Sequence, residues 1–300
     1  MHNKPINYSF IIPHHNSPKL LKRCLDSIPQ REDLEIIVID DNSDADKKPQ
    51  VERLDVNLIF IDAEHTKGAG RARNYGLKEA KGKWIVFADA DDFFVPSFID
   101  ILDQYKDQDL EVVYHDAKAV HTIDLSPMPG LLQQHNKFFS MYDGSTNATD
   151  VIKFRLHSPW WKMVRREFIE KYQIQFEEVP KGNDVFFTYQ VGYFAKKVAI
   201  DKRQLYVYTY NPNGITNGKK HPQIYLNSLR NSLKKKEFYE FIGHPDWIKN
   251  NTFRFWTKIV KKSGIKVFLI TLFNYIKLRS SMISTKMAYV NSIKSRNIKS

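Results

Sequence analysis

The sequence has almost no cysteine and no long apolar run near its start. Cys24 is the only cysteine, which excludes an internal disulfide and any zinc site built from several thiolates. It falls within the apolar spacing of an expected helix over 17–28, where a free thiol packs like a small hydrophobic side chain. Because no apolar run follows the first residues, we expect no signal peptide and take a cytoplasmic location as the default.

Acidic residues are scarce toward the C-terminus. Residues 219–300 hold 18 of the 46 Lys and Arg but only three of the 34 Asp and Glu, a net charge of +15, whereas residues 1–218 carry −3. A near-neutral body argues against nucleic acid as the partner, and the basic end favours a local anionic contact. The uncharged run 267–276 is too short to cross a bilayer but suits a helix lying on an anionic membrane. The alternative is a helical subdomain with solvated lysines.

Short β-branched runs alternate with helical patterns in the first third of the chain, which is typical of βαβ units and a parallel sheet. Residues 36–39 are apolar on both faces of their expected strand, as a sheet covered by helices on both sides requires. The expected strands are 8–12, 34–40, 56–61 and 83–88, and the expected helices are 17–28, 67–80 and 97–105.

Turn-forming residues interrupt this pattern between 126 and 147, which we interpret as a loop or mobile cover. The later elements are expected at 150–156 and 160–165, as helices at 167–172 and 184–195, and as a strand at 204–210. Beyond residue 218 the sequence turns helical, basic and aromatic. We therefore expect a catalytic domain over 1–218, with its nucleotide-binding half over 1–115 and its acceptor half over 116–218, and a basic helical extension over 219–300.

Two acidic clusters each follow an expected strand directly, at residues 40–43 and 89–92. Ligands of an open parallel sheet bind beyond the carboxyl ends of its strands, so the two clusters can converge on one ligand. Asp89 and Asp91 form an Asp-x-Asp turn, whose carboxylates suit Mg²⁺ or Mn²⁺ bound to substrate phosphates. The spacing suggests a metal-bridged diphosphate, and the alternative is that these acids only form turns and cap helices.

A glycine-flanked segment, 68–76, opens the expected helix between the clusters and carries Arg71 and Arg73. Its glycine spacing is not that of a dinucleotide fingerprint, and no strand immediately precedes it. Such a helix start can still offer backbone N–H groups and positive charge to a phosphate. Solvated arginines are the alternative.

Four motifs, in order, resemble those of the large second family of inverting glycosyltransferases, which have the GT-A fold. The family patterns are Pro-x-Tyr-Asn, Asp-Asp-Gly-Ser, Gly-x-x-x-Ala-Arg-Asn-x-Gly and Leu-Asp-x-Asp-Asp. The matching segments here are Pro13-His14-His15-Asn16, Asp40-Asp41-Asn42-Ser43, residues 70–76, and Ala88-Asp89-Ala90-Asp91-Asp92.

The resemblance implies an α/β GT-A fold, with a Rossmann-like, mostly parallel sheet flanked by helices and followed here by the helical extension. It implies that Asp41 contacts the uracil of a UDP-sugar, Asp89 the ribose, and Asp91 the metal, Mn²⁺ or Mg²⁺, on the diphosphate. The other donor-binding candidates belong to the same motifs and are Pro13, His15, Asn16, Asp40, Arg71, Arg73, Asn74 and Ala90.

The resemblance returns at 160–187, where Trp160-Trp161-Lys162 looks like the family's Trp-x-Lys and residues 182–187 look like its Glu-Asp-x-x-Phe. The family's last Asp is the catalytic base, a role that passes to Asp184; the alternative is a charge favoured by the helix dipole. Trp160 and Trp161 are acceptor-binding candidates, because an indole can stack on a sugar, and core packing is their alternative.

Three departures qualify the resemblance. His15 stands where the family has tyrosine, and Asn183 replaces the acid before the base, which removes one charge that could have raised its pKa. The segment 208–214 lacks the His or Arg often found there, so a third metal ligand or diphosphate contact stays unassigned.

The sequence thus predicts an inverting transfer of a hexose or N-acetylhexosamine from a UDP-sugar to a saccharide acceptor. If the basic end meets a membrane, by family analogy the acceptor is a lipid-linked glycan of surface polysaccharide assembly and the enzyme is peripheral at the inner face of the cell membrane. Two rivals are a sugar-nucleotide-forming nucleotidyltransferase, which would need a glycine-rich loop that Pro13–Asn16 lacks, and a non-catalytic binding module.

Overall fold

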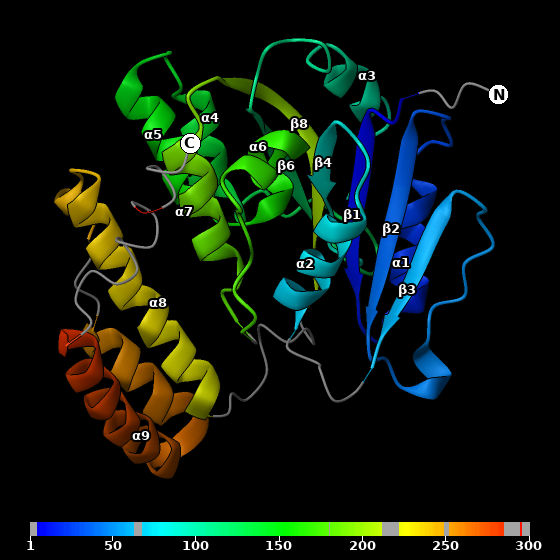
Figure 1. The fold of residues 1–300 in the computed structure, drawn as a ribbon. Coiled ribbons are helices and arrows are strands. Elements are labelled where there is room, and N and C mark those ends of the chain that lie inside the picture. The colour runs from blue at the N-terminus through cyan, green and yellow to red at the C-terminus, as the bar shows by residue number, and fades with distance from the viewer. Residues whose placement is uncertain are drawn as a thin grey trace. The chain divides into compact units, whose positions relative to one another are not determined.

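The computed structural model describes residues 5–62, 68–179, 181–211, 222–248, 252–284 and 295. The chain divides into two compact units, one of Met1–Glu178 with Asn183–Asn211 and one of Val179–Gly182 with Pro212–Ser300. Two expected boundaries, the helix start at Lys67 and the domain limit at 218, lie outside the described residues. Figure 1 shows the strands of the first unit and the helices α8 and α9 of the second.

The described part of the first unit is built on an eight-stranded sheet in the order β3-β2-β1-β4-β7-β6-β8-β5. Its first half is parallel and consists of β1 (Tyr8–His14), β2 (Leu34–Asp41), β3 (Val56–Ile61) and β4 (Trp84–Phe87). Residues 36–39 are fully buried, which confirms that the sheet is covered on both faces. The expected mixed architecture with a mostly parallel sheet is confirmed.

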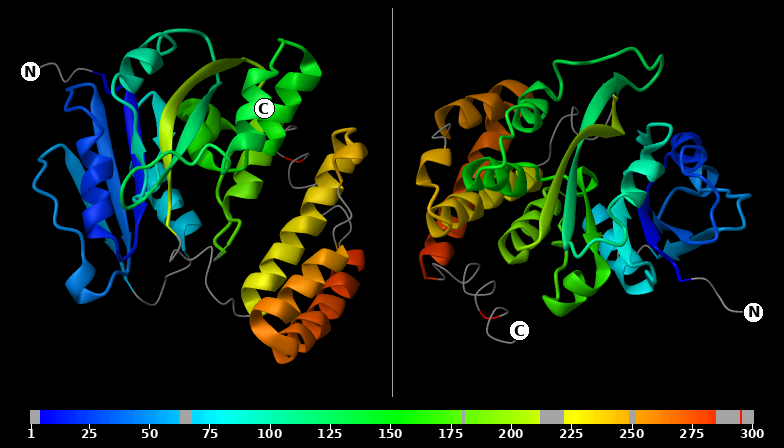
Figure 2. Two further views of the ribbon diagram at one scale, coloured as in Figure 1. Left: turned by 180° about the vertical axis from the view of Figure 1, so that it is seen from behind. Right: turned by 90° about the horizontal axis from the view of Figure 1, so that it is seen from above.

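Helices α1 (Pro18–Asp26) and α2 (Ala69–Glu79) cover opposite faces of this parallel half (Figures 1 and 2). α2 lies very close to the sheet at Gly76, where an added Cβ would stand 2.4 Å from Ile11 Cγ2 and 2.9 Å from Ile39 Cδ1. Only glycine avoids that overlap, so Gly76 sets the depth at which α2 packs and hence the position of the arginines on its first turns.

The second half of the sheet is mixed and consists of β5 (Phe93–Phe94), β6 (Val112–His121), β7 (Lys162–Arg165) and β8 (Val198–Tyr210). β7 pairs antiparallel with β4 and β6, whereas β6 and β8 are parallel with a register shift between His115 and Ala117. β5 pairs antiparallel with β8 and so ties residues 89–92, which we call the acidic loop, to the end of β8. Strand β6 was not predicted from the sequence.

The prediction of a loop or mobile cover over 126–147 is wrong, because α4 (Gln133–Ser140) and the start of α5 (Thr146–Arg155) lie there. β6 already ends at His121, before the turn-forming residues begin. Leu132 and Phe139 are buried and hold α4 on the sheet. Ser145 caps the start of α5, because its hydroxyl accepts the N–H of Ala148 at 3.2 Å. Tertiary packing and a side-chain cap therefore decide the structure of this segment.

The remaining helices of the first unit agree with the expected ones to within a few residues. α3 spans Phe98–Asp103, α6 spans Arg166–Lys171 and α7 spans Asp184–Phe194, and short 3-10 turns cover Ala45–Lys47 and Pro159–Trp161.

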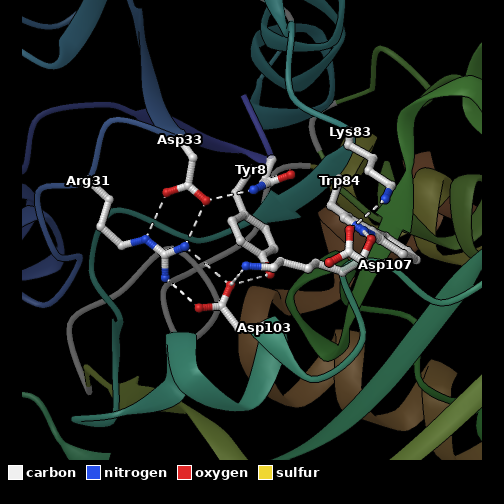
Figure 3. Close-up of polar contacts among 9 residues, drawn as sticks. Tyr8, Arg31, Asp33, Lys83, Trp84, Asp103 and Asp107 are labelled. Carbon is white, nitrogen blue, oxygen red and sulfur yellow. Dashed lines mark hydrogen bonds and ion pairs between the residues drawn. The ribbon is translucent and has the colours of Figure 1, made fainter. Parts of the chain in front are cut away.

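A polar network closes the amino ends of β1 and β2 (Figure 3). Arg31 contacts Asp33 and Asp103 at 2.7 Å each, and the Tyr8 hydroxyl donates to Asp103 Oδ1 at 3.0 Å. Asn7 adds a hydrogen bond to Asp33 Oδ2 at 2.7 Å. The network joins β1, the turn before β2 and α3, at the end of the sheet opposite to the acidic clusters.

In the second unit α8 (Pro222–Phe241) packs on α9 (Thr252–Ser284). α9 is broken at Gly264, whose φ of 84° is left-handed, so its two halves fold back on each other. The Trp256 ring contacts those of Phe268 and Tyr275, each with centroids 5.6 Å apart. Within the described ranges, none of the helices combines the length and the apolar character needed to cross a bilayer.

Candidate active site

The two acidic clusters meet at the carboxyl edge of the parallel strands. Register pairs His14 of β1 with Asp40 of β2, and Ile11 of β1 with Phe87 of β4. The turns that follow these three strands therefore begin side by side, as expected from the sequence.

Asp40 is fully engaged inside the protein. The backbone N–H of Ser17 donates to His14 Nε2 at 3.1 Å, so the ring proton lies on Nδ1, which donates to Asp40 Oδ1 at 2.7 Å. Ser43 donates its hydroxyl to the same oxygen at 2.5 Å and its N–H to Oδ2 at 3.1 Å. Asp40 is buried with His14, so in this structure it shapes the turn that carries Asp41.

His15 and Asn16, which are predicted to bind the sugar donor, are hydrogen-bonded to the turn after β2, and we call this contact the clasp. Asn16 and Asn42 both take left-handed φ values, 54° and 57°. The Asn16 side chain accepts the N–H of Asp44 at 2.8 Å, and His15 Nδ1 lies 2.9 Å from the carbonyl oxygen of Asp41. Pro13 is half-buried and His15 is exposed at the edge of this clasp.

Asp41 has an oxygen available for a ligand. Its carboxyl group is buried, yet no described residue makes a hydrogen bond to Oδ1. Burial raises the pKa of Asp41, and His15, the N–H of Gly68 and Arg71 oppose that rise. A ligand that donates a hydrogen bond to Oδ1, as a uracil N–H can, would satisfy the buried acceptor.

Arg73 joins the acidic loop to the start of α7. Its Nη2 donates to Asp89 Oδ1 at 2.5 Å and its Nη1 to Asn183 Oδ1 at 3.0 Å, while the Phe176 ring lies 5.4 Å from the guanidinium carbon. Arg73 is buried and Asp89 is about one-third exposed. The structure thus brings together Asp89 and Asp184, the residue that follows Asn183.

The other residues predicted on α2 have partners within the protein. Arg71 Nη2 donates to the Tyr75 hydroxyl at 3.2 Å, and Tyr75 also lies under its guanidinium group. Asn74 exchanges two hydrogen bonds with the backbone of Phe176, at 3.0 and 2.9 Å. Asn74 therefore fastens the segment before α7 to α2, next to the candidate site.

Asp91 is an acid of the loop whose charged form is disfavoured by its surroundings. Burial, then the charge of Asp89, raises its pKa to about 6. None of the described side chains donates a hydrogen bond to its carboxylate, although its backbone carbonyl accepts from Arg23 Nη2 and Thr209 Oγ1 at 2.6 Å each. A cation bound at Asp91 would relieve the repulsion between the two carboxylates.

Asp92, Arg23 and Thr209 form a support for this loop that the sequence analysis missed. Asp92 is fully buried and accepts from the Tyr206 hydroxyl at 2.8 Å and the Thr209 N–H at 2.7 Å. Burial and the neighbouring acids raise its pKa well above the usual range. The third acid in the cluster was the available signal, but its partners come from β8, far away in sequence.

The donor set at Asp91 fits Mn²⁺ or Mg²⁺ as a single protein carboxylate. Asp89 is paired with Arg73, and Asp92 is buried with its own donors, so among the described acids of the loop Asp91 is the one whose carboxylate lacks a donor within the protein. Among the described residues no three His, Cys, Asp or Glu side chains gather into a metal site. The remaining ligands would come from water and substrate phosphates, as is usual for Mg²⁺.

Asp184 begins α7 and lies in a buried environment. Burial raises its pKa, and Arg73 opposes the rise. Lys162, in the Trp-x-Lys segment, is fully buried and donates to the Leu156 and Ser158 carbonyls and to Thr188 Oγ1 at 3.1–3.2 Å. Burial lowers the pKa of Lys162 to about 7, with Asp184 acting in the opposite direction. Lys162 therefore ties the Trp-x-Lys segment to α7, one turn beyond the candidate base.

The structure places Trp160 and Trp161 in the core. Their side chains are 4% and 2% exposed. Trp160 stacks on Tyr206 with ring centroids 4.7 Å apart, and Trp161 stacks on Phe139 at 5.8 Å. Their indole faces are covered by aromatic neighbours, which is the core alternative to stacking on an acceptor. Ala90 is also buried, within the acidic loop.

Comparison with known proteins agrees with this geometry. A family model described as Glycosyl transferase family 2 matches residues 9–173. The putative glycosyltransferase EpsH of Bacillus subtilis is 23% identical over 246 residues, which cover 77% of this chain and 64% of EpsH. A Campylobacter jejuni GalNAc(5)-diNAcBac-PP-undecaprenol beta-1,3-glucosyltransferase is 38% identical over 90 residues, 28% of this chain and 29% of that protein.

Among solved structures, residues 1–349 of Staphylococcus aureus TarS in complex with UDP-GlcNAc have the same fold. The TM-score is 0.61 with 19% sequence identity, and the alignment covers 91% of this chain and 81% of that one. The likeness confirms the expected GT-A fold. The chain spans less than two-thirds of EpsH and of the Campylobacter protein.

Proposed function

The chain belongs to glycosyl transferase family 2, and on that basis we propose that it transfers a hexose or N-acetylhexosamine from a UDP-sugar to a saccharide acceptor with inversion. One observation supports this most strongly. Arg73 contacts Asp89 in the acidic loop and Asn183 at the start of α7. The donor-side acids and the candidate base, Asp184, are therefore held at one place.

The chemistry is a single displacement at the anomeric carbon. An acceptor hydroxyl oxygen forms a bond to that carbon while the bond to the diphosphate oxygen breaks on the opposite face, which inverts the configuration. The bonding electrons leave with UDP, and the hydroxyl proton passes to the Asp184 carboxylate. Because burial raises the pKa of Asp184, it is a stronger base than an exposed aspartate.

Asp91 is the proposed protein ligand for Mn²⁺ or Mg²⁺. When bound, such a cation stabilises the negative charge that develops on the departing diphosphate. Arg23 and Thr209 hold the Asp91 backbone in place from below. Asp92 accepts hydrogen bonds from two residues of β8 and so fixes the position of the acidic loop. It is not proposed as a ligand of the cation.

The buried Oδ1 of Asp41, which has no hydrogen-bond donor among the described residues, supports UDP as the nucleotide, because it can accept the N–H of uracil. Solved TarS structures include complexes with UDP and with UDP-GlcNAc, which supports the same donor class. The names of relatives support an acceptor in surface polysaccharide synthesis. The Campylobacter protein acts on a glycan linked to PP-undecaprenol, and TarS on poly(ribitol-phosphate). A saccharide acceptor, free or lipid-linked, is therefore part of the proposal.

The donor assignment is tested by calorimetry with UDP, CDP and GDP in the presence of Mn²⁺. UDP should bind most tightly, and Asp41→Asn should weaken UDP more than CDP, because the amide no longer offers a charged acceptor to the base. Asp46→Asn, which changes an exposed acid of the same loop region, is the matched control. Equal binding of the three nucleotides, or an unchanged UDP affinity in Asp41→Asn, would remove Asp41 from the proposal.

Turnover is then measured as UDP released from a panel of UDP-sugars, with and without saccharide acceptors. Release that depends on acceptor supports transfer. Pyrophosphate formed from UTP and a sugar phosphate would instead identify a nucleotidyltransferase.

A further inference from the structure

Helix α9 is drawn orange to red in Figures 1 and 2. Its second half carries a group of exposed apolar side chains. Ile265, Leu269, Phe273 and Ile276 are 60%, 56%, 59% and 58% exposed, and Ile270 is also exposed. Their spacing of three and four residues places the first four on one side of the helix. Large apolar side chains that are more than half exposed and contiguous mark an interaction surface. We call these five residues the α9 apolar face.

This face is additional to the packing surface of the helix. Thr271 is fully buried on another side, and Phe268 and Tyr275 contact Trp256 in the first half of α9. Helix α9 thus already has an inner side that packs within its own unit. The exposed side chains are not needed to build that core.

Positive charge surrounds the α9 apolar face. Residues 252–284 contain seven Lys and Arg and no Asp or Glu. Lys266 and Lys277 are exposed on the same half of the helix, and Lys258, Lys261 and Lys262 are exposed on the half before Gly264. An apolar helix side bordered by lysines has the two components of interfacial membrane binding, burial of apolar surface and attraction to anionic headgroups.

We propose that the α9 apolar face inserts into the headgroup region of an anionic lipid bilayer and holds the protein there without spanning it. Other occupants match the surface less well. Nucleic acid would leave five large apolar side chains in water, and a second copy of the chain would bring two rows of lysines together. The proposal does not depend on the sugar-transfer reaction, because no residue of α9 belongs to the candidate active site.

The test is co-sedimentation of the full chain with phosphatidylcholine vesicles that contain or lack phosphatidylglycerol, at low and high salt. The wild-type protein should bind only the anionic vesicles, and salt should weaken binding. Leu269→Gln with Phe273→Gln should lower the partition coefficient about tenfold or more, because each side chain loses its transfer into the bilayer. Lys266→Gln with Lys277→Gln should lower it about fivefold per lysine.

Leu54→Gln with Met141→Gln is the matched control, because it removes two exposed apolar side chains from the first unit. This control should bind vesicles like the wild type, and all variants should keep the same melting temperature and the same UDP release with a soluble acceptor.

Any of the following results would overturn the proposal. The first is a wild-type protein that ignores anionic vesicles at low salt, and the second is a Leu269→Gln, Phe273→Gln variant that binds them normally. The third is a large drop in the melting temperature of that variant, which would show that the face is covered by the chain itself. The fourth is a wild-type dimer that the same substitutions convert to a monomer, or wild-type binding to RNA in place of vesicles.

Discussion

Replacement of Asp184 by asparagine separates its role as a base from its role in the fold. Asparagine has nearly the same shape but cannot accept the proton of the attacking hydroxyl. The hydrogen bonds of Arg73 go to Asp89 and Asn183, so they survive the substitution. We therefore expect a catalytic defect in a correctly assembled site.

The expected loss in kcat is about 10²–10⁴-fold, the usual contribution of a positioned general base. The expected change in the free energy of unfolding is small, because two effects of the substitution oppose each other. Burial raises the pKa of Asp184 above its value in the unfolded chain, so the ionised carboxylate destabilises the folded protein at neutral pH. Asparagine removes that cost, while loss of a first-turn charge costs ~0.3–1 kcal/mol.

The assay measures UDP release under saturating donor and acceptor, UDP affinity by calorimetry with Mn²⁺, and the melting temperature. Asp184→Asn should bind UDP like the wild type and melt within about 4 °C of it. Asp100→Asn is the matched control, because Asp100 is an exposed first-turn acid of α3. It should leave kcat unchanged. The reasoning is refuted if Asp184→Asn keeps kcat within about fivefold of the wild type, or if UDP affinity falls together with kcat.

Asp91→Asn should abolish Mn²⁺-dependent turnover, and unchanged turnover at ordinary Mn²⁺ concentrations would contradict the metal assignment. In the wild type, the Mn²⁺ affinity measured by calorimetry should fall as the pH drops through about 6, the raised pKa of Asp91, because protonation removes the ligand. Arg23→Met should lower turnover about tenfold or more, the value of one charged hydrogen bond, and should move the acid limit of Mn²⁺ binding to higher pH, whereas Lys22→Met, on the exposed side of α1, should do neither. Asp33→Asn should reduce the free energy of unfolding at neutral pH by about 1 kcal/mol after allowance for solvent screening, because Arg31 lowers the pKa of Asp33 to about 2. That stability is complete above the unfolded pKa and is lost as pH falls toward 2, so the denaturant midpoint of Asp33→Asn should approach that of the wild type in strong acid, and equal midpoints at neutral pH would show that the pair contributes nothing.

The parallel half of the sheet could be predicted because its signal is local. Strands such as β2 are apolar on both faces, and apolar residues recur every three or four positions in the helices between them. The rule that ligands bind at the carboxyl ends of parallel strands then predicts Asp41 and Asp91 at one edge of the sheet from the sequence alone. Register pairs β1 with both β2 and β4, which is why that inference held.

The acceptor half was harder because its structure depends on distant contacts. α4 follows a proline-rich turn and is held by buried Phe139, and residues of β6 pair with residues of β8 that lie 86–89 positions later in the chain. The sequence around Trp160 and Trp161 does not distinguish tryptophans that line a site from tryptophans that fill a core. Only their stacking on residues such as Tyr206 shows which environment they occupy.

The candidate site shows the same division. Asp89 and Asp91 are recognisable from the Asp-x-Asp spacing, but Arg23 looks like one more solvated arginine on a helix. Its position under the Asp91 carbonyl depends on the packing of α1 beside β5 and β8. Asp40 is the opposite case. Its motif suggests a contact with a ligand, but in the structure its oxygens accept hydrogen bonds from His14 and Ser43.

The most direct test of the central proposal is the anomeric configuration of the product, followed by NMR from the first turnover. The purified protein is incubated with Mn²⁺, a saccharide acceptor and a UDP-hexose or UDP-N-acetylhexosamine that supports UDP release. We predict a glycoside of configuration opposite to that of the donor, formed at the rate of UDP release and about 10²–10⁴-fold more slowly with Asp184→Asn. A product that retains the donor configuration, or UDP-sugars left intact with every acceptor, would contradict it.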